Sequence, residues 1–245
     1  MIKKIEGIII SEIDYKETSK IINIFSADHG IIGVIAHGAK KLKNPFKAST
    51  SKLTYGLFHI NYKEKGLSSL IAIDVINNFK NIKKDLVKIS YATFISELVT
   101  QVYKHENNKN IYQIYIDSLT KIDEGYDAQV ITNIFELKML DYLGIRPIID
   151  SCVNCGRTNN IVTISSYEGG YLCKDCLTNE PVALSKTVKL IRMFYYVDIG
   201  KITKLDISDR VKYEINTFID DYYDRYAGLY LKSKNFLKNL NKLGV

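Results

Sequence analysis

Long hydrophobic runs are absent from the sequence, and this absence argues against a membrane protein. No apolar stretch approaches the ~18 residues that a membrane-spanning helix needs. The N-terminal stretch has lysines and a short apolar run, but Glu6, Ser11 and Glu12 fall in or beside that run, and no small-residue cleavage site follows. We therefore expect no signal peptide, no membrane partner and a cytoplasmic location.

Familiar catalytic motifs are also missing. The sequence contains no P-loop, no dinucleotide-binding fingerprint and no nucleophile elbow. A zinc deaminase is excluded because no histidine is followed two residues later by Glu and no proline precedes either cysteine pair. The carboxylates of Asp14, Glu17 and Asp28 are best interpreted as surface charges at strand ends and in a turn. We predict that the protein is not an enzyme.

Cysteines are few, but their spacing is informative. The four cysteines form two Cys-x-x-Cys pairs, with seventeen residues between the pairs. Such spacing lets four thiolates surround one ion as a tetrahedron. Disulfides or buried free thiols are the alternatives, yet disulfides fit a cytoplasmic chain poorly. We predict one zinc ion, which is structural because four thiolates leave no open coordination position. The predicted ligands are Cys152, Cys155, Cys173 and Cys176.

Acidic residues are absent between His29 and Glu64, within a chain whose formal net charge is +7. Residues 37–52 fall in this gap and contain five lysines, and Gly38, Asn44 and Pro45 indicate a loop. Lysine side chains neutralise phosphates without reading sequence, so this loop is a candidate nucleic-acid site. A solvated charged loop is the alternative. We expect phosphate contacts from Lys40, Lys41, Lys43 and Lys47, assisted by Lys20 and Lys52.

Residues 1–80 have the pattern of β-structure. Apolar runs rich in isoleucine and aromatic residues occur at residues 5–13, 19–26, 31–37, 53–62 and 69–77. Alternation places Phe58, Ile60 and Tyr62 on one face, and Ile71, Ile73 and Val75 form a second face. Five strands in this length predict an OB-fold barrel. Such barrels stack bases on aromatic side chains, for which the candidates are Phe46, Tyr55, Phe58 and Tyr62.

After residue 80 the apolar spacing becomes helical. Helices are predicted at about residues 83–105, 110–123 and 127–143, and two more are expected to begin after N-caps at Ser185 and Ser208. The predicted fold is of the α+β class. It consists of an OB-fold at residues 1–80, an all-helical domain at residues 81–150 and 181–245, and a zinc module inserted at residues 151–180.

Several segments also occur in a familiar order. They are Asp14-Tyr15-x-Glu17-x-Ser19-Lys20, Gly38-Ala39-Lys40-Lys41-x-Lys43, Leu143-Gly144-x-x-Pro147, Cys152-x-x-Cys155-Gly156 and Gly169-Gly170-x-x-Cys173-x-x-Cys176. In order and spacing, the chain resembles the RecO family of bacterial DNA repair and recombination mediators over nearly its whole length.

The resemblance implies a function more specific than the residue patterns do. RecO-like proteins bind single- and double-stranded DNA, anneal complementary strands, and act with RecR to load RecA onto DNA coated by single-stranded-DNA-binding protein. Some contact the acidic tail of that coating protein through the helical domain, for which the basic residues of 181–245 are candidates here. A nucleoid-associated location would follow. The alternative is an OB-fold with a zinc ribbon that binds RNA or another protein.

Overall fold

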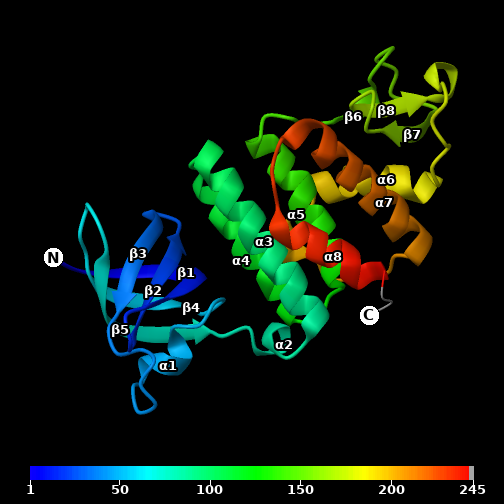
Figure 1. Ribbon diagram of the computed structural model, residues 1–245. Coiled ribbons are helices and arrows are strands. Elements are labelled where there is room, and N and C mark those ends of the chain that lie inside the picture. The colour runs from blue at the N-terminus through cyan, green and yellow to red at the C-terminus, as the bar shows by residue number, and fades with distance from the viewer. Residues whose placement is uncertain (243–245) are drawn as a thin grey trace. The chain divides into compact units, whose positions relative to one another are not determined.

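A computed structural model describes the backbone of residues 1–242 and the side chains up to Leu237 (Figure 1). The chain forms two compact units. The first comprises Met1–Lys84 together with Asn107–Gln113, and the second comprises Asp85–Glu106 together with the chain from Ile114 onward. The chain therefore passes from one unit to the other three times, after Lys84, after Glu106 and after Gln113.

The first unit contains a closed five-stranded barrel, which confirms the predicted OB-fold. Its strands follow the order β1-β2-β3-β5-β4. A short parallel pairing joins β3 to β5, whereas the other neighbours are antiparallel. The strands are β1 (Ile2–Tyr15), β2 (Ser19–Ser26), β3 (Gly30–Ala36), β4 (Tyr55–Asn61) and β5 (Ser68–Asn77).

Alternating apolar residues fill the barrel interior, as the period of two predicts. In β4, Phe58 and Ile60 are fully buried, while the intervening His59 is partly exposed. The other strands contribute in the same way. Buried members of this core include Ile5, Ile9, Ile22, Ile24, Val34 and Leu70.

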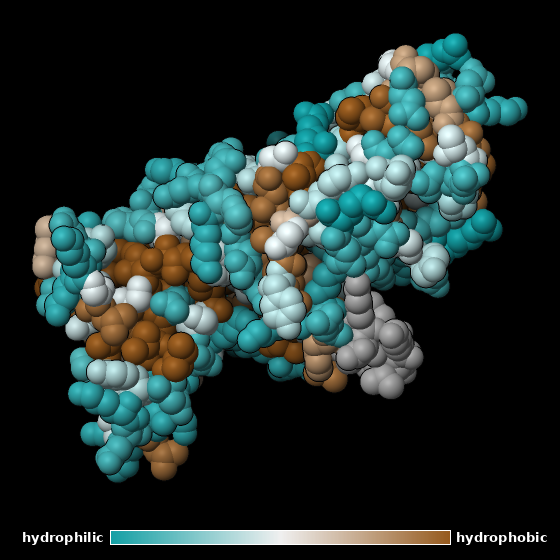
Figure 2. All heavy atoms as spheres, turned by 45° about the horizontal axis from the view of Figure 1, so that its top comes forward, coloured by the Kyte–Doolittle hydropathy of each residue, from teal (hydrophilic) through white to brown (hydrophobic). Residues whose placement is uncertain are grey.

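Strand β5 departs from its predicted alternation. Ile71 and Val75 are 46% and 41% exposed, so they do not form an inward face with Ile73. The ladder is irregular at two places. His59 pairs with Ala72 but Ile60 pairs with Leu70, so Ile71 has no partner in β4, and Val75 lies beside a second irregularity, between its partner Gly56 and Tyr55. Such a bulge inverts the inward and outward positions beyond it. Apolar side chains accordingly reach the surface of the barrel unit (Figure 2).

The second unit is mainly helical. Asp85 and Asp127 begin two of its helices, and each carboxylate accepts two backbone N–H bonds from the first turn. The helix that follows Asp127 is buried over most of its circumference, as its sequence predicted. The helices of the chain are α1 (Phe46–Ser49), α2 (Lys80–Lys83), α3 (Leu86–His105), α4 (Lys109–Asp123), α5 (Ala128–Tyr142), α6 (Ser185–Tyr196), α7 (Asp209–Tyr222) and α8 (Lys232–Lys242).

Of the two predicted N-caps, Ser208 was placed correctly and Ser185 was not. Ser185 is the first residue inside α6, and Ser208 occupies the N-cap position of α7 without a side-chain capping bond. At α6 the acceptor comes from another helix instead. Glu214 of α7 accepts the Leu184 backbone N–H at 3.0 Å and the Thr187 hydroxyl at 2.5 Å. A distant carboxylate thus replaces the local cap.

A small three-stranded sheet carries the cysteines. Strands β6 (Ile148–Cys152), β7 (Ile161–Ser165) and β8 (Gly170–Cys173) have the order β6-β8-β7, followed by a 3₁₀ turn at Lys174–Cys176. Gly170 allows β6 and β8 to approach, because a Cβ there would lie 2.2 Å from the backbone oxygen of Ile148. Across the described residues, the helices are all too short or too polar to span a bilayer.

Replacing Asp85 with alanine is expected to lower the free energy of unfolding of the helical unit by about 1 kcal/mol. The reason is that the amides of Val87 and Lys88, 2.9 and 3.0 Å from its Oδ1, would lose their acceptor. Urea unfolding followed by circular dichroism measures the loss. Asp85→Asn keeps an acceptor oxygen and should lose less. Equal losses in the two variants would assign the effect to charge rather than to hydrogen bonding.

Candidate nucleic-acid interface and metal centre

The connection between β3 and β4 is an ordered structure, which we call the basic loop (residues 37–54). Gly38 has a positive φ of 67°, and its carbonyl accepts the Lys41 N–H at 3.0 Å. Asn44 holds the second half: its side-chain oxygen accepts the Phe46 N–H at 2.8 Å, and its side-chain amide donates to the His37 carbonyl at 3.3 Å. The loop is therefore shaped by its own hydrogen bonds.

The basic loop is also fixed to the barrel. Ala39 and Leu53 are fully buried, and Phe46 packs against the barrel core. Two hydrogen bonds join the loop to the region where the turn after β1 leads into β2: the Lys40 N–H donates to the Thr18 carbonyl at 2.9 Å, and the Gly38 N–H donates to the hydroxyl of Ser19, the first residue of β2, at 3.3 Å. These contacts set the direction in which the lysines leave the surface.

The six predicted lysines differ in their surroundings. Lys40 forms an ion pair with Asp14 at 2.8 Å, and Lys20 forms one with Glu12 at 2.6 Å. The hydrogen bond from Lys40 is the main cause that lowers the pKa of Asp14. Lys52 is partly buried. By contrast, the side chains of three residues are exposed and form no ion pair with any described residue: Lys41, Lys43 and Lys47.

The aromatic candidates are not arranged as a stacking platform. Phe58 is completely buried, so its prediction as a base-stacking residue was wrong. Phe46 and Tyr62 are partly buried against the core, and Lys3 Nζ lies 4.0 Å from the centre of the Tyr62 ring. Tyr55 donates its hydroxyl to Glu6, and burial is the main cause that raises its pKa to about 12. Alternation placed Phe58 on the same face as Ile60, but sequence alone did not show that this face was the inner one.

The structure brings the four cysteines together. Their sulfur atoms all lie within 4.8 Å of one another, and the Sγ atoms of Cys155 and Cys173 are 3.6 Å apart. Cys152 and Cys173 are buried, Cys176 is partly buried and Cys155 is exposed. These residues fit a metal ion, because four thiol sulfurs at these separations match the donor set of a tetrahedral site.

Each cysteine pair lies in a tight turn at the end of a strand. In the first, the Gly156 N–H donates to the Cys152 carbonyl at 2.8 Å, and Gly156 has a positive φ of 73°. The second pair spans the 3₁₀ turn Lys174–Cys176, where the Lys174 N–H donates to the carbonyl of Asn160, just before β7, at 3.0 Å. An ion pair between Arg157 and Asp175 links the two turns. Backbone hydrogen bonds and one ion pair thus fix the two turns around the sulfurs.

The electrostatics of the cluster favour a bound cation. Burial opposes ionisation of the Cys152 thiol, but backbone hydrogen bonds from Cys173, Cys155 and Asn154 outweigh it and lower its pKa to about 6. Hydrogen bonds with Cys155 and Cys173 are the leading causes that raise the pKa of Cys176 to about 12. The thiols of Cys152 and Cys176 therefore ionise over different pH ranges, and a cation bound among the sulfurs would favour the thiolate form.

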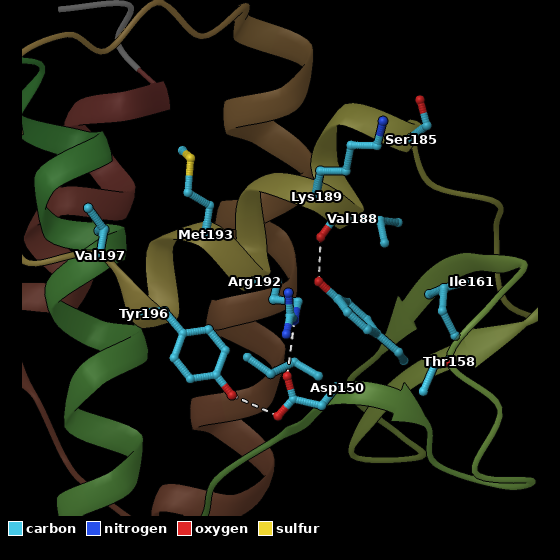
Figure 3. Close-up of a pocket in the computed structure, with 12 residues that line it drawn as sticks. Asp150, Thr158, Ile161, Ser185, Val188, Lys189, Arg192, Met193, Tyr196 and Val197 are labelled. Carbon is cyan, nitrogen blue, oxygen red and sulfur yellow. Dashed lines mark hydrogen bonds and ion pairs between the residues drawn. The ribbon is translucent and has the colours of Figure 1, made fainter.

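A groove of about 940 Å³ lies between the cysteine module and α6 (Figure 3). Its charged edge includes Lys189 and Arg192 from α6. Asp150 of β6 faces Arg192 and binds it at 3.0 Å, and it accepts the Tyr196 hydroxyl at 2.7 Å, whereas Lys189 extends toward Ser185. The apolar side chains that line it are Ile149, Ile161, Val188, Met193 and Val197. Sequence reasoning missed the groove, since only the excess of basic residues after residue 180 pointed to this region.

Comparison with known proteins agrees with this architecture. Residues 1–79 match the model of the N-terminal domain of recombination protein O, and residues 83–235 match the model of its C-terminal domain. The chain belongs to the RecO family. Its relatives include "DNA repair protein RecO" of Halalkalibacterium halodurans, which is 36% identical over 100% of this chain and 97% of the relative.

Other RecO relatives match at similar length. The protein of Listeria innocua is 36% identical over 98% of this chain and 95% of its own length, and that of Bacillus pumilus is 34% identical over 99% and 96%. Both are named DNA repair protein RecO. The resemblance noted from the sequence is confirmed, and this chain is a RecO-family DNA repair protein.

Titrating this RecO protein with Co²⁺ or Cd²⁺ is expected to produce sulfur-to-metal charge-transfer absorption that saturates at about one ion per chain. Cys155→Ser should weaken the absorption, because it removes one of four sulfur donors. Ser151→Ala is the matched control, since it lies beside Cys152 and leaves every thiol in place. Absorption unchanged by Cys155→Ser would contradict a four-sulfur site.

Proposed function

We propose that this RecO protein is a non-enzymatic recombination mediator. It binds single- and double-stranded DNA, anneals complementary strands and, together with RecR, helps load RecA onto DNA coated by single-stranded-DNA-binding protein. The observation that carries the proposal is the basic loop on the OB-fold barrel. There, Lys41, Lys43 and Lys47 extend into solvent without an ion pair to any residue that the structure describes.

The chemistry of the basic loop suits annealing. Lysines contact phosphates as point charges and release counterions, so they bind any sequence. Contacts to the backbone leave the base edges available, and a strand held in this way can still pair with its complement. Lys20 and Lys40 play a secondary role, because DNA phosphates must compete with Glu12 and Asp14 for them.

Replacing Lys41 and Lys43 together with glutamate is expected to weaken binding of single-stranded DNA at least tenfold at low salt, through lost phosphate contacts and new repulsion. The slope of log affinity against log salt should fall by about 1–2. Fluorescence anisotropy of a labelled oligonucleotide measures both quantities. Lys104→Glu combined with Lys232→Glu alters two exposed lysines of the other unit and is the charge-matched control. Equal losses in both double variants would remove the basic loop from the site.

The groove beside α6 is our proposed site for the acidic tail of the single-stranded-DNA-binding protein. Apolar side chains of the tail would enter the groove, and its carboxylates would meet Lys189 and Arg192 at the edge. Lys189 is exposed, whereas Arg192 is held in position by Asp150. Charge complementarity of this kind selects an acidic partner over a basic one.

Glutamate at both Lys189 and Arg192 is expected to weaken binding of a fluorescent peptide carrying that acidic tail by about tenfold or more, because two attractions become repulsions. Affinity for bare single-stranded DNA should stay near that of the unmodified protein. Lys104→Glu, an exposed lysine on α3 in the same unit, is the control. Unchanged peptide affinity in the double variant would place the tail elsewhere.

We further propose that the metal is zinc and that its role is structural. Zinc prefers tetrahedral thiolate sites, and four cysteines would fill its coordination sphere. Elemental analysis of the purified protein should then give about one zinc per chain. Cys152→Ser should lower this content and destabilise the sheet β6-β8-β7, whereas a metal-free protein of normal stability would contradict the proposal.

The decisive test of the function is annealing of two complementary oligonucleotides coated with single-stranded-DNA-binding protein, in the absence of any nucleotide. This RecO protein should accelerate the reaction, and the Lys41/Lys43 double variant should not. A protein that binds structured RNA more tightly than single-stranded DNA, and leaves annealing unchanged, would support the alternative of an RNA-binding or protein-interaction module.

A further inference from the structure

Leu42 lies in the basic loop with its side chain in water. It is 86% exposed, more than any other large hydrophobic side chain in the part of the chain whose side chains are described. Its neighbours in the sequence, Lys41 and Lys43, are exposed as well. An aliphatic side chain is therefore presented to solvent between two positive charges.

The fold makes no use of this side chain. The residues that anchor the basic loop are Ala39, Phe46 and Leu53, which lie in or against the core. The conformation on either side of Leu42 is set by backbone hydrogen bonds, including Asn44 N–H to the Lys41 carbonyl at 3.1 Å. A polar residue at position 42 would satisfy the same structure, so packing does not account for the leucine.

Single exposed leucines occur on many protein surfaces, and the surroundings distinguish this one. The loop is ordered, so its apolar tip is presented in one direction. The sequence around it has no acid between Asp28 and Glu64, which favours an anionic ligand. The aromatic side chains expected to stack on bases are instead buried or packed against the barrel, as Phe58 and Phe46 show.

We propose that Leu42 contacts the bases of single-stranded DNA and packs against or between them while Lys41 and Lys43 hold the flanking phosphates. This inference rests on the proposed function and adds a base-contacting residue to it. Aliphatic wedges are known to enter base steps when lysines or arginines hold the backbone. Base faces are apolar and alike in all four nucleotides, so the contact is independent of sequence.

The proposal predicts a preference between DNA forms. The faces of bases in a single strand are accessible, whereas those in a duplex are stacked and must be separated at a free-energy cost before Leu42 can enter. Leu42 should therefore strengthen binding to single strands more than to duplexes. It should also disturb stacking at the bases it touches, which lysines that bind only phosphates would not do.

The test compares Leu42→Ser with the unmodified protein, using a single-stranded oligonucleotide that contains 2-aminopurine, whose fluorescence rises when it unstacks. We expect single-strand affinity to fall about three- to tenfold, as partial loss of leucine burial implies. The fluorescence rise on binding should be reduced, duplex affinity should change less, and the salt slope should be unchanged. Leu42→Phe should retain both affinity and the fluorescence response.

Leu86→Ser is the matched control, because Leu86 is also exposed, at 58%, but begins α3 outside the basic loop. Equal thermal midpoints of all variants would show that folding is intact. The proposal is overturned if Leu42→Ser binds single strands and changes 2-aminopurine fluorescence as the unmodified protein does, while the Lys41/Lys43 variant loses binding. If that lysine variant binds normally, the basic loop itself is not the DNA site, and the two failures are thereby distinguished.

Discussion

The closure of the barrel is the constraint from which the basic loop follows. Strand β5 lies between β3 and β4, and it is joined to β3 by only two parallel pairs, Val34 with Ser68 and Ile35 with Ser69. The chain leaving β3 therefore cannot make a hairpin into β4 and must cross to a strand that is not its neighbour. This crossing explains why residues 37–54 are long enough to carry an independent, folded cluster of lysines.

In both units, charge compensation distinguishes groups that are paired within the protein from groups that can bind a ligand. Near the barrel, Asp14 and Glu12 neutralise Lys40 and Lys20, whereas Lys41 and Lys43 find no acidic partner among the described residues. In the cysteine module the four sulfurs lie within 4.8 Å of one another, and hydrogen bonds with Cys155 and Cys173 raise the pKa of Cys176. An uncompensated charge at a defined position attracts its opposite, which supports the proposed phosphate contacts at the loop and the proposed metal ion at the sulfurs.

The sequence predicted most elements well, because strong periodicity and spacing report local physics. The five strands and the long helices were found within a few residues, and the Cys-x-x-Cys pairs predicted a cluster whose sulfurs the fold does bring together. Predictions failed where the local structure depends on residues that are distant in the sequence. The bulge at Ile71 depends on its pairing with β4, and the cap of α6 comes from Glu214, which lies thirty residues from Leu184. The pairing of Lys40 with Asp14 likewise joins residues that only the folded barrel brings together.

With the two proposed sites, one on the basic loop and one in the groove beside α6, the protein would bind a coated DNA strand through both of its units. Such a strand offers phosphates where it is exposed and acidic tails where it is covered, and the chain passes between the two units three times. When one unit binds, the other is held at a high effective concentration near the same strand, so two moderate affinities combine into a stronger one. Either proposed contact could then be released while the other still holds the strand. This property would suit the proposed mediator role, in which a strand is held long enough to pair and is then released.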